Sequence, residues 1–194
     1  MWYAVAVLLG YLLGSIPISL LVARAHGVDL RATADGNPGA WNALQQLGAR
    51  RAWPAFVGDG VKGTAAGLIG LELAGIAGAY VAVAAAMVGH ALPLFARFRG
   101  GKSVMTFAGG AFALSPVAAA IALAACALVA LAARSFTWGA RLGVFGFPLV
   151  QLALDPPARV AATGALMSLI GMRFLLARRS DALATSAPDE PRAS

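Results

Sequence analysis

The stretch WPAFVGDGVKGTAAGLIGLELAGIAGAYVAVAAAMVGHALPL, from Trp53 to Leu94, decides the fold class of this sequence. It is almost wholly apolar, and it is about twice as long as the roughly 20 residues with which a helix crosses a hydrocarbon core of about 30 Å. We therefore read it as two transmembrane helices, Trp53–Leu73 and Gly75–Leu94. Neither run shows the alternation of apolar and polar residues that is typical of barrel strands.

Further apolar runs lie on both sides of this stretch: Trp2–Ala23, Val104–Leu114, Val117–Ala133, Leu142–Leu154 and Val160–Leu176. Hydrophobic residues make up 60% of the sequence and charged residues 12%, whereas a typical soluble domain has about 25% charged residues. The sequence thus predicts an all-α integral membrane protein with about seven transmembrane helices in a single domain, residues 1–179. The many small residues predict close helix packing in lipid.

Other features of the composition exclude several classes of protein. The single cysteine, Cys126, lies inside an apolar run, so no disulfide framework or zinc site is expected. The net charge of +7 would suit nucleic acid, but the basic residues flank the apolar runs and do not follow one soluble face. The first run has no basic segment before it, so we read it as a span and not as a signal peptide.

The basic residues also predict the orientation of the chain. Most of the basic residues lie in the connections that follow odd-numbered spans. The connections that follow even-numbered spans carry only Arg159. By the positive-inside rule the N-terminus is outside and the C-terminus is cytoplasmic. The glycine-rich loops fall on the same basic side, so a site built from them would face the cytoplasm. The polar segment 180–194 is expected to be a disordered tail.

A first polar loop, ADGNPGAWN at residues 34–42, is rich in glycine and asparagine. Because these residues accept positive φ angles, successive amides of such a loop can point into one concavity and bind an anion such as phosphate. An ordinary turn between two spans explains the same composition. The loop is a candidate phosphate site, and the turn is the alternative.

A second polar loop, FRGGKSV at residues 98–104, places two glycines between two cations just before an apolar run. A glycine-rich turn that opens a helix offers free amides and the positive end of the helix dipole, and Lys102 adds a charge for a phosphoryl group. The spacing of a Walker loop is absent, so binding of a nucleoside triphosphate is not indicated. A basic membrane flank is the alternative.

Isolated polar residues within or beside the spans are further candidates. Asp59 and Lys62 share one helical face, where an ion pair would border a polar cavity, and a proton relay fits the same pattern. A flank pair that snorkels to the membrane interface is the alternative. His90 is either a structural hydrogen-bonding residue or a base. Thr137 either binds phosphate or caps the next helix. No spacing of acidic residues and histidines supports a metal site.

Several motifs follow one another along the chain: GSIP at 14–17, DGNPGA at 35–40 with Asn42, DGVKG at 59–63, GH at 89–90 with Pro93, and GGK at 100–102. Their order and spacing resemble those of the PlsY family of bacterial acyl-phosphate-dependent glycerol-3-phosphate acyltransferases. The resemblance implies a polytopic enzyme of the plasma (inner) membrane. It also implies transfer of a fatty acyl group from acyl-phosphate to the 1-hydroxyl of glycerol-3-phosphate, which gives lysophosphatidic acid for phospholipid biosynthesis.

The resemblance and the polar loops together give a candidate site and its partners. We assign catalytic roles to Lys102, Asp35 and Asn37. Substrate or phosphate binding is assigned to Gly36, Gly39, Asn42, Asp59, Lys62, His90, Gly100, Gly101, Ser103 and Thr137. The expected partners are the two substrates, membrane lipids and an enzyme that produces acyl-phosphate. No cofactor, metal or nucleic acid is expected.

Some positions depart from the family pattern. Asp35 stands where the family has serine, Trp41 where it has threonine, and Gln45 where a phosphate-binding arginine is usual. Ser103 replaces a glycine, and the family's His-Arg-x-Asn pattern near the last span is reduced to Met172–Leu175. Loss of a bidentate arginine and gain of a carboxylate would weaken phosphate binding by about 2 to 4 kcal/mol if nothing compensates.

An acyl-phosphate is already activated, so the site mainly has to hold two anions with the hydroxyl in line for attack. Loop amides and Lys102 would stabilise the developing negative charge. Either the substrate phosphate or Asp35 would accept the hydroxyl proton. Two other functions stay open: a paralogue that has lost catalysis and binds a lipid or membrane partner, and a small-solute or proton-coupled transporter built around Asp59 and Lys62.

Overall fold

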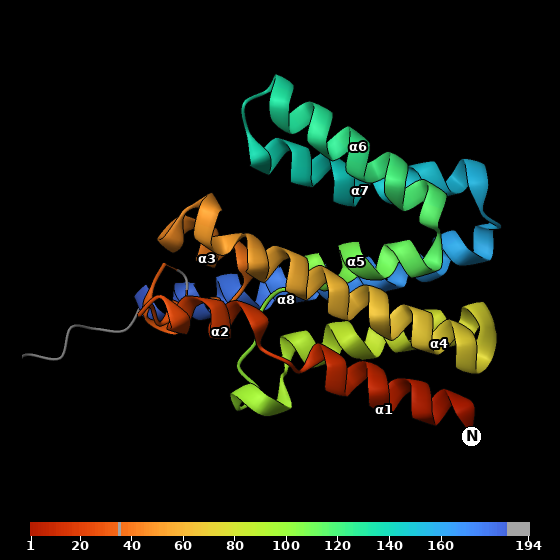
Figure 1. Ribbon diagram of the computed structural model, residues 1–194, viewed down its shortest axis with the longest axis horizontal. Coiled ribbons are helices and arrows are strands. Elements are labelled where there is room, and N and C mark those ends of the chain that lie inside the picture. Colours follow the sequence, from red (N-terminus) through yellow and green to blue (C-terminus); the bar gives the residue numbers. More distant parts are fainter. Residues whose placement is uncertain (35, 186–194) are drawn as a thin grey trace, which may run out of the picture.

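The computed structural model describes residues 1–34 and 36–185, and all regular structure within them is helical (Figure 1). The all-α prediction is therefore confirmed for this part of the chain. The helices are α1 (Trp2–Gly14), α2 (Ile18–Ala25), α3 (Ala40–Leu47), α4 (Ala49–Ala91), α5 (Val104–Leu114), α6 (Pro116–Ala132), α7 (Phe136–Leu154) and α8 (Pro157–Thr185), with short 3-10 turns η1 (Leu30–Ala32) and η2 (Leu94–Ala96).

Helix α4 is a hairpin of two antiparallel helices. Its backbone leaves the helical region at Ala74 and at Gly75, where φ is 65° and glycine is favoured. The two arms then run side by side, so close that a Cβ added to Gly70 would lie 2.6 Å from the Cβ of Ala82. The predicted boundary between the spans Trp53–Leu73 and Gly75–Leu94 is thus confirmed.

The segments Trp2–Ala25, Ala49–Ala96 and Pro157–Ala177 are long and apolar enough to cross a membrane. The first is broken at the GSIP motif, where α1 ends at Gly14 and α2 begins at Ile18. Helix α5 has 11 residues, and its length of about 16 Å is too short to cross a core of roughly 30 Å alone. A full crossing by the predicted span Val104–Leu114 is therefore corrected to a partial one.

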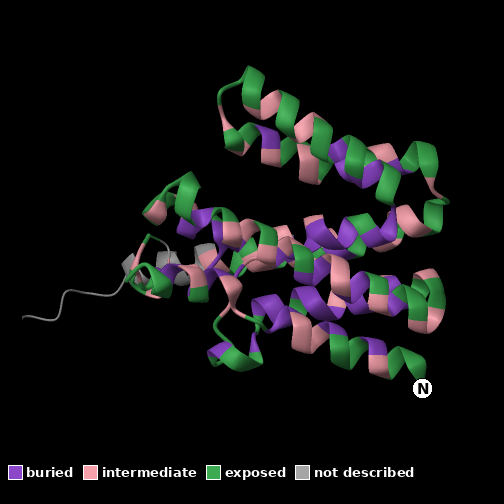
Figure 2. Cartoon of the chain, viewed as in Figure 1, coloured by how far each residue is buried: buried purple, intermediate pink, exposed green. Residues whose placement is uncertain are grey.

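Small residues allow the helices to approach closely, as the composition predicts. A Cβ on Gly14 of α1 would lie 2.6 Å from the Cα of Ala86 in the second arm of α4. A Cβ on Gly109 of α5 would lie 2.7 Å from the Cα of Gly60 in the first arm. Many large apolar residues are instead exposed, and Figure 2 shows much of α6 and α7 in the colour of exposed residues. This arrangement is typical of helices that pack in lipid.

The polar connections gather at one end of the bundle. Figure 1 shows α2, α3, η2, the α6–α7 connection and the last turns of α8 at the end opposite to the N-terminus. Beneath them lies a small apolar cluster that includes Leu20, Leu30, Ala43 and Ala96. The structure thus brings the two polar loops, far apart in the sequence, onto a common support.

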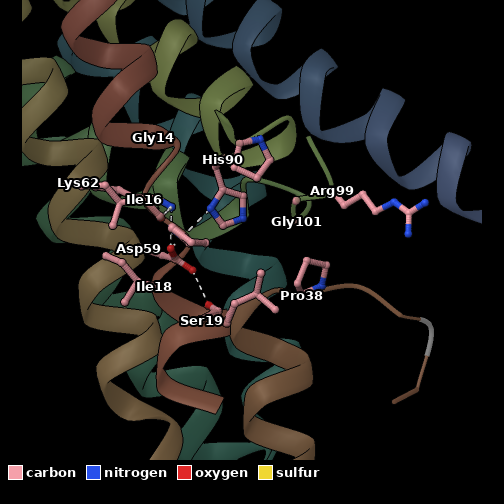
Figure 3. Close-up of a pocket in the computed structure, with 14 residues that line it drawn as sticks. Gly14, Ile16, Ile18, Ser19, Pro38, Asp59, Lys62, His90, Arg99 and Gly101 are labelled. Carbon is pink, nitrogen blue, oxygen red and sulfur yellow. Dashed lines mark hydrogen bonds and ion pairs between the residues drawn. The ribbon is translucent and has the colours of Figure 1, made fainter. Parts of the chain in front are cut away.

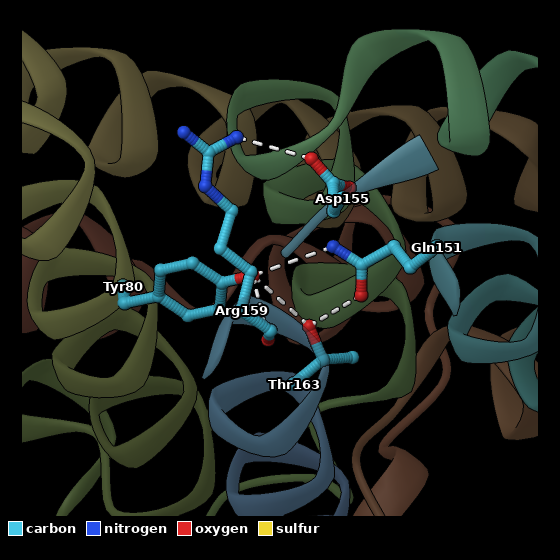
Figure 4. Close-up of polar contacts among 5 residues, drawn as sticks. All are labelled: Tyr80, Gln151, Asp155, Arg159 and Thr163. Atoms are coloured by element: carbon cyan, nitrogen blue, oxygen red, sulfur yellow. Dashed lines mark hydrogen bonds and ion pairs between the residues drawn. The ribbon is translucent and has the colours of Figure 1, made fainter. Parts of the chain in front are cut away.

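At the other end, a polar network joins α7 and α8 to the second arm of α4 (Figure 4). The Thr163 hydroxyl donates to Gln151 Oε1 at 2.7 Å, and Gln151 Nε2 donates to the Tyr80 hydroxyl at 3.3 Å. Arg159 pairs with Asp155 at 3.0 Å. Gln151 and Thr163 are fully buried, so each satisfies the other in an apolar setting. This network fixes the α7–α8 turn.

Helix α8 continues to Thr185, past the predicted start of the tail at residue 180. Residues 186–194 lie outside the described residues. Disorder of the tail stays a prediction for that segment.

Candidate active site

A pocket of about 390 Å³ opens where the first loop (residues 34–42), the second loop (residues 98–104) and α8 meet. It is lined by Arg31, Gly36, Asn37, Pro38, Phe98, Arg99, Gly100, Lys102, Arg173, Leu176 and Ala177. The sequence-based prediction that both loops build one site is consistent with this arrangement. The third wall comes from α8, which follows the part of the sequence that carries most of the predicted motifs.

The charge of the lining is strongly positive. Four of the lining side chains are cationic: Arg31, Arg99, Lys102 and Arg173. None of the described lining residues is acidic. The predicted catalytic residue Asp35 lies outside the described residues. A pocket with this lining favours anions, above all those with two or more oxygens that can face separate cations.

Arg31 connects the two loops. Its Nη2 donates to the carbonyl oxygen of Ala96 at 2.6 Å and to that of Arg99 at 3.0 Å. Its own backbone N–H donates to the Asp29 carboxylate at 3.0 Å, which fixes η1. The guanidinium is thereby held at the pocket wall, beside the second loop.

Helix α8 holds the second loop from the other side. Arg173 donates from Nε to the Gly101 carbonyl oxygen and from Nη2 to the Gly100 carbonyl oxygen, each at 3.3 Å. The next residue, Phe174, places its ring centroid 4.7 Å from Lys102 Nζ. A cation over an aromatic face is attracted to it. Two consecutive residues of α8 therefore fix the predicted catalytic lysine and its loop.

The prediction that backbone amides of the loops bind an anion is wrong for three glycines. The N–H groups of Gly36 and Gly39 donate to the carbonyl oxygens of Thr33 and Asn37, both at 2.9 Å. The N–H of Gly101 donates to His90 O at 3.1 Å. These amides close their own turns, so cationic side chains supply the positive field of the pocket.

Asn42, predicted to bind substrate, instead organises the first loop. Its side chain is buried, and its amide nitrogen lies 2.9 Å from Leu30 O, 3.2 Å from Thr33 O and 3.0 Å from Asn37 O. The side-chain donors are thus used by backbone carbonyls. Asn42 is a positioning residue for the loop and does not line the pocket, and Gly39 is likewise absent from the lining.

Ser103 and Thr137 do not line the pocket either. The buried Ser103 hydroxyl donates to Met87 O at 2.7 Å, and the residue has φ 63°, a region that favours glycine. This backbone explains why a glycine would suit the position. Thr137 lies in the first turn of α7. The predicted role of Ser103 and Thr137 in phosphate binding is therefore corrected, because neither lines the pocket.

Asp59, Lys62 and His90 form a buried cluster beside the pocket, together with Ser19 (Figure 3). Lys62 Nζ lies 2.8 Å from Asp59 Oδ1 and donates to Ile16 O at 3.0 Å. The Ser19 hydroxyl donates to Asp59 Oδ2 at 2.6 Å. A cavity of only about 10 Å³ borders the cluster and shares Pro38, Arg99 and Gly100 with the large pocket. The predicted Asp59–Lys62 ion pair is confirmed, but it borders no space large enough for a substrate.

Two departures from the family pattern have clear positions. Gln45 is exposed on α3 and is absent from the lining of both pockets. Trp41 stacks on Phe136, with ring centroids 5.8 Å apart, and thereby joins α3 to the start of α7. Two of the four pocket cations come from outside the two predicted loops. Arg31 enters the sequence-based prediction only as an orientation charge, and Arg173 lies in the reduced Met172–Leu175 pattern without an assigned role. Nothing in the local sequence of Arg31 marks it as a pocket residue.

Comparisons with known proteins agree with this geometry. The family model of glycerol-3-phosphate acyltransferase matches residues 4–184. A glycerol-3-phosphate acyltransferase of Rubrobacter xylanophilus is 44% identical over 152 residues, covering 78% of this chain and 76% of that protein. A glycerol-3-phosphate acyltransferase of a Jannaschia species is 39% identical over 170 residues, covering 86% of this chain and 82% of that protein.

Two solved structures are similar in fold. The glycerol 3-phosphate form of PlsY, an integral membrane glycerol 3-phosphate acyltransferase, has a TM-score of 0.78 at 30% identity and covers 94% of this chain and 92% of that chain. Its lysophosphatidic acid form has a TM-score of 0.75 at 29% identity, with the same coverage of both chains. These relatives favour an acyltransferase over the transporter and the catalytically inactive paralogue.

Proposed function

From the premise that this chain belongs to the glycerol-3-phosphate acyltransferase family, we propose that it transfers a fatty acyl group from an acyl-phosphate to the 1-hydroxyl of glycerol-3-phosphate, giving lysophosphatidic acid. The observation that carries the proposal is the large pocket with four cationic side chains and no acid among its described lining residues. Both substrates carry a phosphate group, so a strongly cationic site suits the pair.

The reaction needs few chemical groups from the protein. The hydroxyl oxygen attacks the acyl carbonyl carbon, a new ester C–O bond forms, and the bond from that carbon to the phosphate oxygen breaks. The phosphate leaves with the electron pair of that bond and accepts the hydroxyl proton. Because the donor is already activated, catalysis rests on holding two anions close together with the hydroxyl in line.

The lining residues divide this work. Lys102, Arg99 and Arg173 stabilise the negative charge that grows on the carbonyl oxygen and on the leaving phosphate. Asn37 and Gly36, on the first loop, contact the glycerol end of the acceptor. Leu176 and Ala177 give the pocket an apolar side on α8, where the acyl chain leaves toward lipid.

The protein works in the bacterial inner membrane with this pocket on the cytoplasmic side. The excess of basic residues in the connections at the pocket end supports that orientation. The acyl-phosphate comes from a separate enzyme that forms it, and the product enters the surrounding lipid. No cofactor takes part in the proposed reaction.

A comparison of donors tests this proposal. Purified protein in nanodiscs receives glycerol-3-phosphate with palmitoyl phosphate, palmitoyl-coenzyme A or a palmitoylated carrier protein. We expect lysophosphatidic acid from palmitoyl phosphate and none above background from either thioester. Product from a thioester at an equal or greater rate would refute the assignment of the donor. An Arg24→Ala variant serves as a control, since Arg24 is exposed and outside the pocket lining.

A further inference from the structure

The buried cluster of Ser19, Asp59, Lys62 and His90 has no role in the reaction as proposed. Asp59 is 1% exposed and Lys62 4%, so both charges lie away from water. Burial of charged groups is costly unless their partners are well placed. The cluster also lies directly beside the pocket, with which its cavity shares three lining residues: Pro38, Arg99 and Gly100. Its position calls for a role beyond packing.

The Asp59 carboxylate gathers groups from separate segments. Lys62 comes from the same helix, Ser19 from α2, and His90 from the end of the second arm of α4, where its Nδ1 lies 3.5 Å from Asp59 Oδ1. Lys62 also reaches the break between α1 and α2 through Ile16 O. The carboxylate thus lies between His90 and the lysine that reaches the α1–α2 break.

His90 in turn holds the second loop. Its carbonyl oxygen accepts a hydrogen bond from Gly101 N–H at 3.1 Å. Its imidazole lies so close to Gly101 that an added Cβ would be 3.2 Å from the ring Cδ2 and closer still to Nε2. The residue after Gly101 is Lys102. A shift of the His90 ring therefore moves the backbone that carries the cation of the pocket.

We propose that Asp59 and His90 are positioning residues for acyl transfer: the Asp59 carboxylate fixes the His90 imidazole, and His90 fixes the Gly100–Gly101 segment so that Lys102 stays in the pocket. This inference rests on the proposed function, because it acts through substrate binding at Lys102. Neither residue touches the reacting atoms. The hydrogen bond from Ser19 and the ion pair with Lys62 hold the orientation of the carboxylate.

The test combines kinetics with a direct readout of the loop in nanodisc-embedded protein. The variants are Asp59→Asn, His90→Phe and the milder Ser19→Ala. We measure kcat and KM for glycerol-3-phosphate, and the rate of tryptic cleavage after Lys102 relative to cleavage after Arg24. Asp155→Asn is the matched control, because it makes the same chemical change to a carboxylate that pairs with Arg159 in the remote network.

We expect Asp59→Asn and His90→Phe to lower kcat/KM about a hundredfold, as displaced catalytic groups do. Both variants should also speed cleavage after Lys102 relative to Arg24, with a smaller effect for Ser19→Ala and none for Asp155→Asn. Equal acceleration at both sites, or unchanged cleavage in folded protein, would overturn the proposal. An inactive wild type would refute the proposed function, while the cleavage ratios would still decide the role of the cluster in holding the loop.

Discussion

Arg173 on α8 donates a hydrogen bond from Nε to the carbonyl oxygen of Gly101, at 3.3 Å. The two residues are far apart in the sequence, and the contact joins the last helix to the loop of the predicted catalytic lysine. A second bond, from Nη2 to Gly100 O, also at 3.3 Å, makes the contact a fork. The last helix is thus part of the site.

Replacing Arg173 by lysine keeps the charge and removes this fork. A lysine ammonium cannot reproduce the fixed geometry of a guanidinium, so Gly100 and Gly101 lose a rigid support. We expect kcat/KM for glycerol-3-phosphate to fall about tenfold while the melting temperature in detergent changes little. Arg159→Lys, in the remote network, is the control and should keep wild-type kinetics. Full activity of Arg173→Lys would show that the charge alone suffices.

Lys102→Ala removes the cation that the cluster and α8 hold in place. We expect turnover to fall by more than about a hundredfold, because one charge that stabilises the transition state is lost from a preorganised site. Membrane insertion and yield should not change, since Lys102 lies in a loop between helices. Initial rates with palmitoyl phosphate measure the effect, and Arg24→Ala is the control. Near-wild-type turnover would exclude Lys102 from catalysis.

Asn42→Ala tests how the first loop is held. The buried amide serves the carbonyl oxygens of Leu30, Thr33 and Asn37, and its removal takes one donor away from each of them. The expected cost is about 2 kcal/mol of folding free energy. The melting temperature should therefore drop, and KM for glycerol-3-phosphate should rise as the loop loosens. Gln45→Ala, three residues on and exposed, is the control. A rise in KM without loss of stability would instead indicate direct contact of Asn42 with substrate.

Cysteine labelling tests the orientation. In a Cys126→Ala background, a cysteine at the exposed position Arg50 lies at the pocket end, and one at the exposed position Ala158 lies at the other end. The positive-inside rule predicts that a membrane-impermeant reagent on intact cells labels Ala158→Cys and spares Arg50→Cys until the cells are opened. The reverse pattern would place the pocket outside the cell.

Much of the fold could be predicted from the sequence, because burial in lipid imposes long apolar helices. The hairpin within α4 was predictable for the same reason, since two spans fill the stretch around Gly75. The bounds of the short helix α5 were predicted too, because the apolar run Val104–Leu114 ends before Ser115 and Pro116.

The candidate site was predictable only in part. The motif residues Gly36, Asn37, Gly100 and Lys102 meet in one pocket, as expected. The binding mode was not foreseen, because the Gly101 N–H is used by His90 O, which only the fold brings near. Arg173 lies in the reduced Met172–Leu175 pattern but was given no role, and Arg31 was missed altogether. A basic residue at a membrane flank has the same local sequence whether it faces a lipid head group or a substrate.

The central claim is acyl transfer within the cationic pocket, and one measurement tests it most directly. Purified wild-type protein in nanodiscs receives palmitoyl phosphate and glycerol-3-phosphate, and lysophosphatidic acid and inorganic phosphate are counted over time, with Lys102→Ala alongside. The account predicts that both products form in equal amounts with wild type, only when glycerol-3-phosphate is present, and that both fall to background in the variant. Phosphate release without lysophosphatidic acid, or no reaction by the folded wild type, would contradict it.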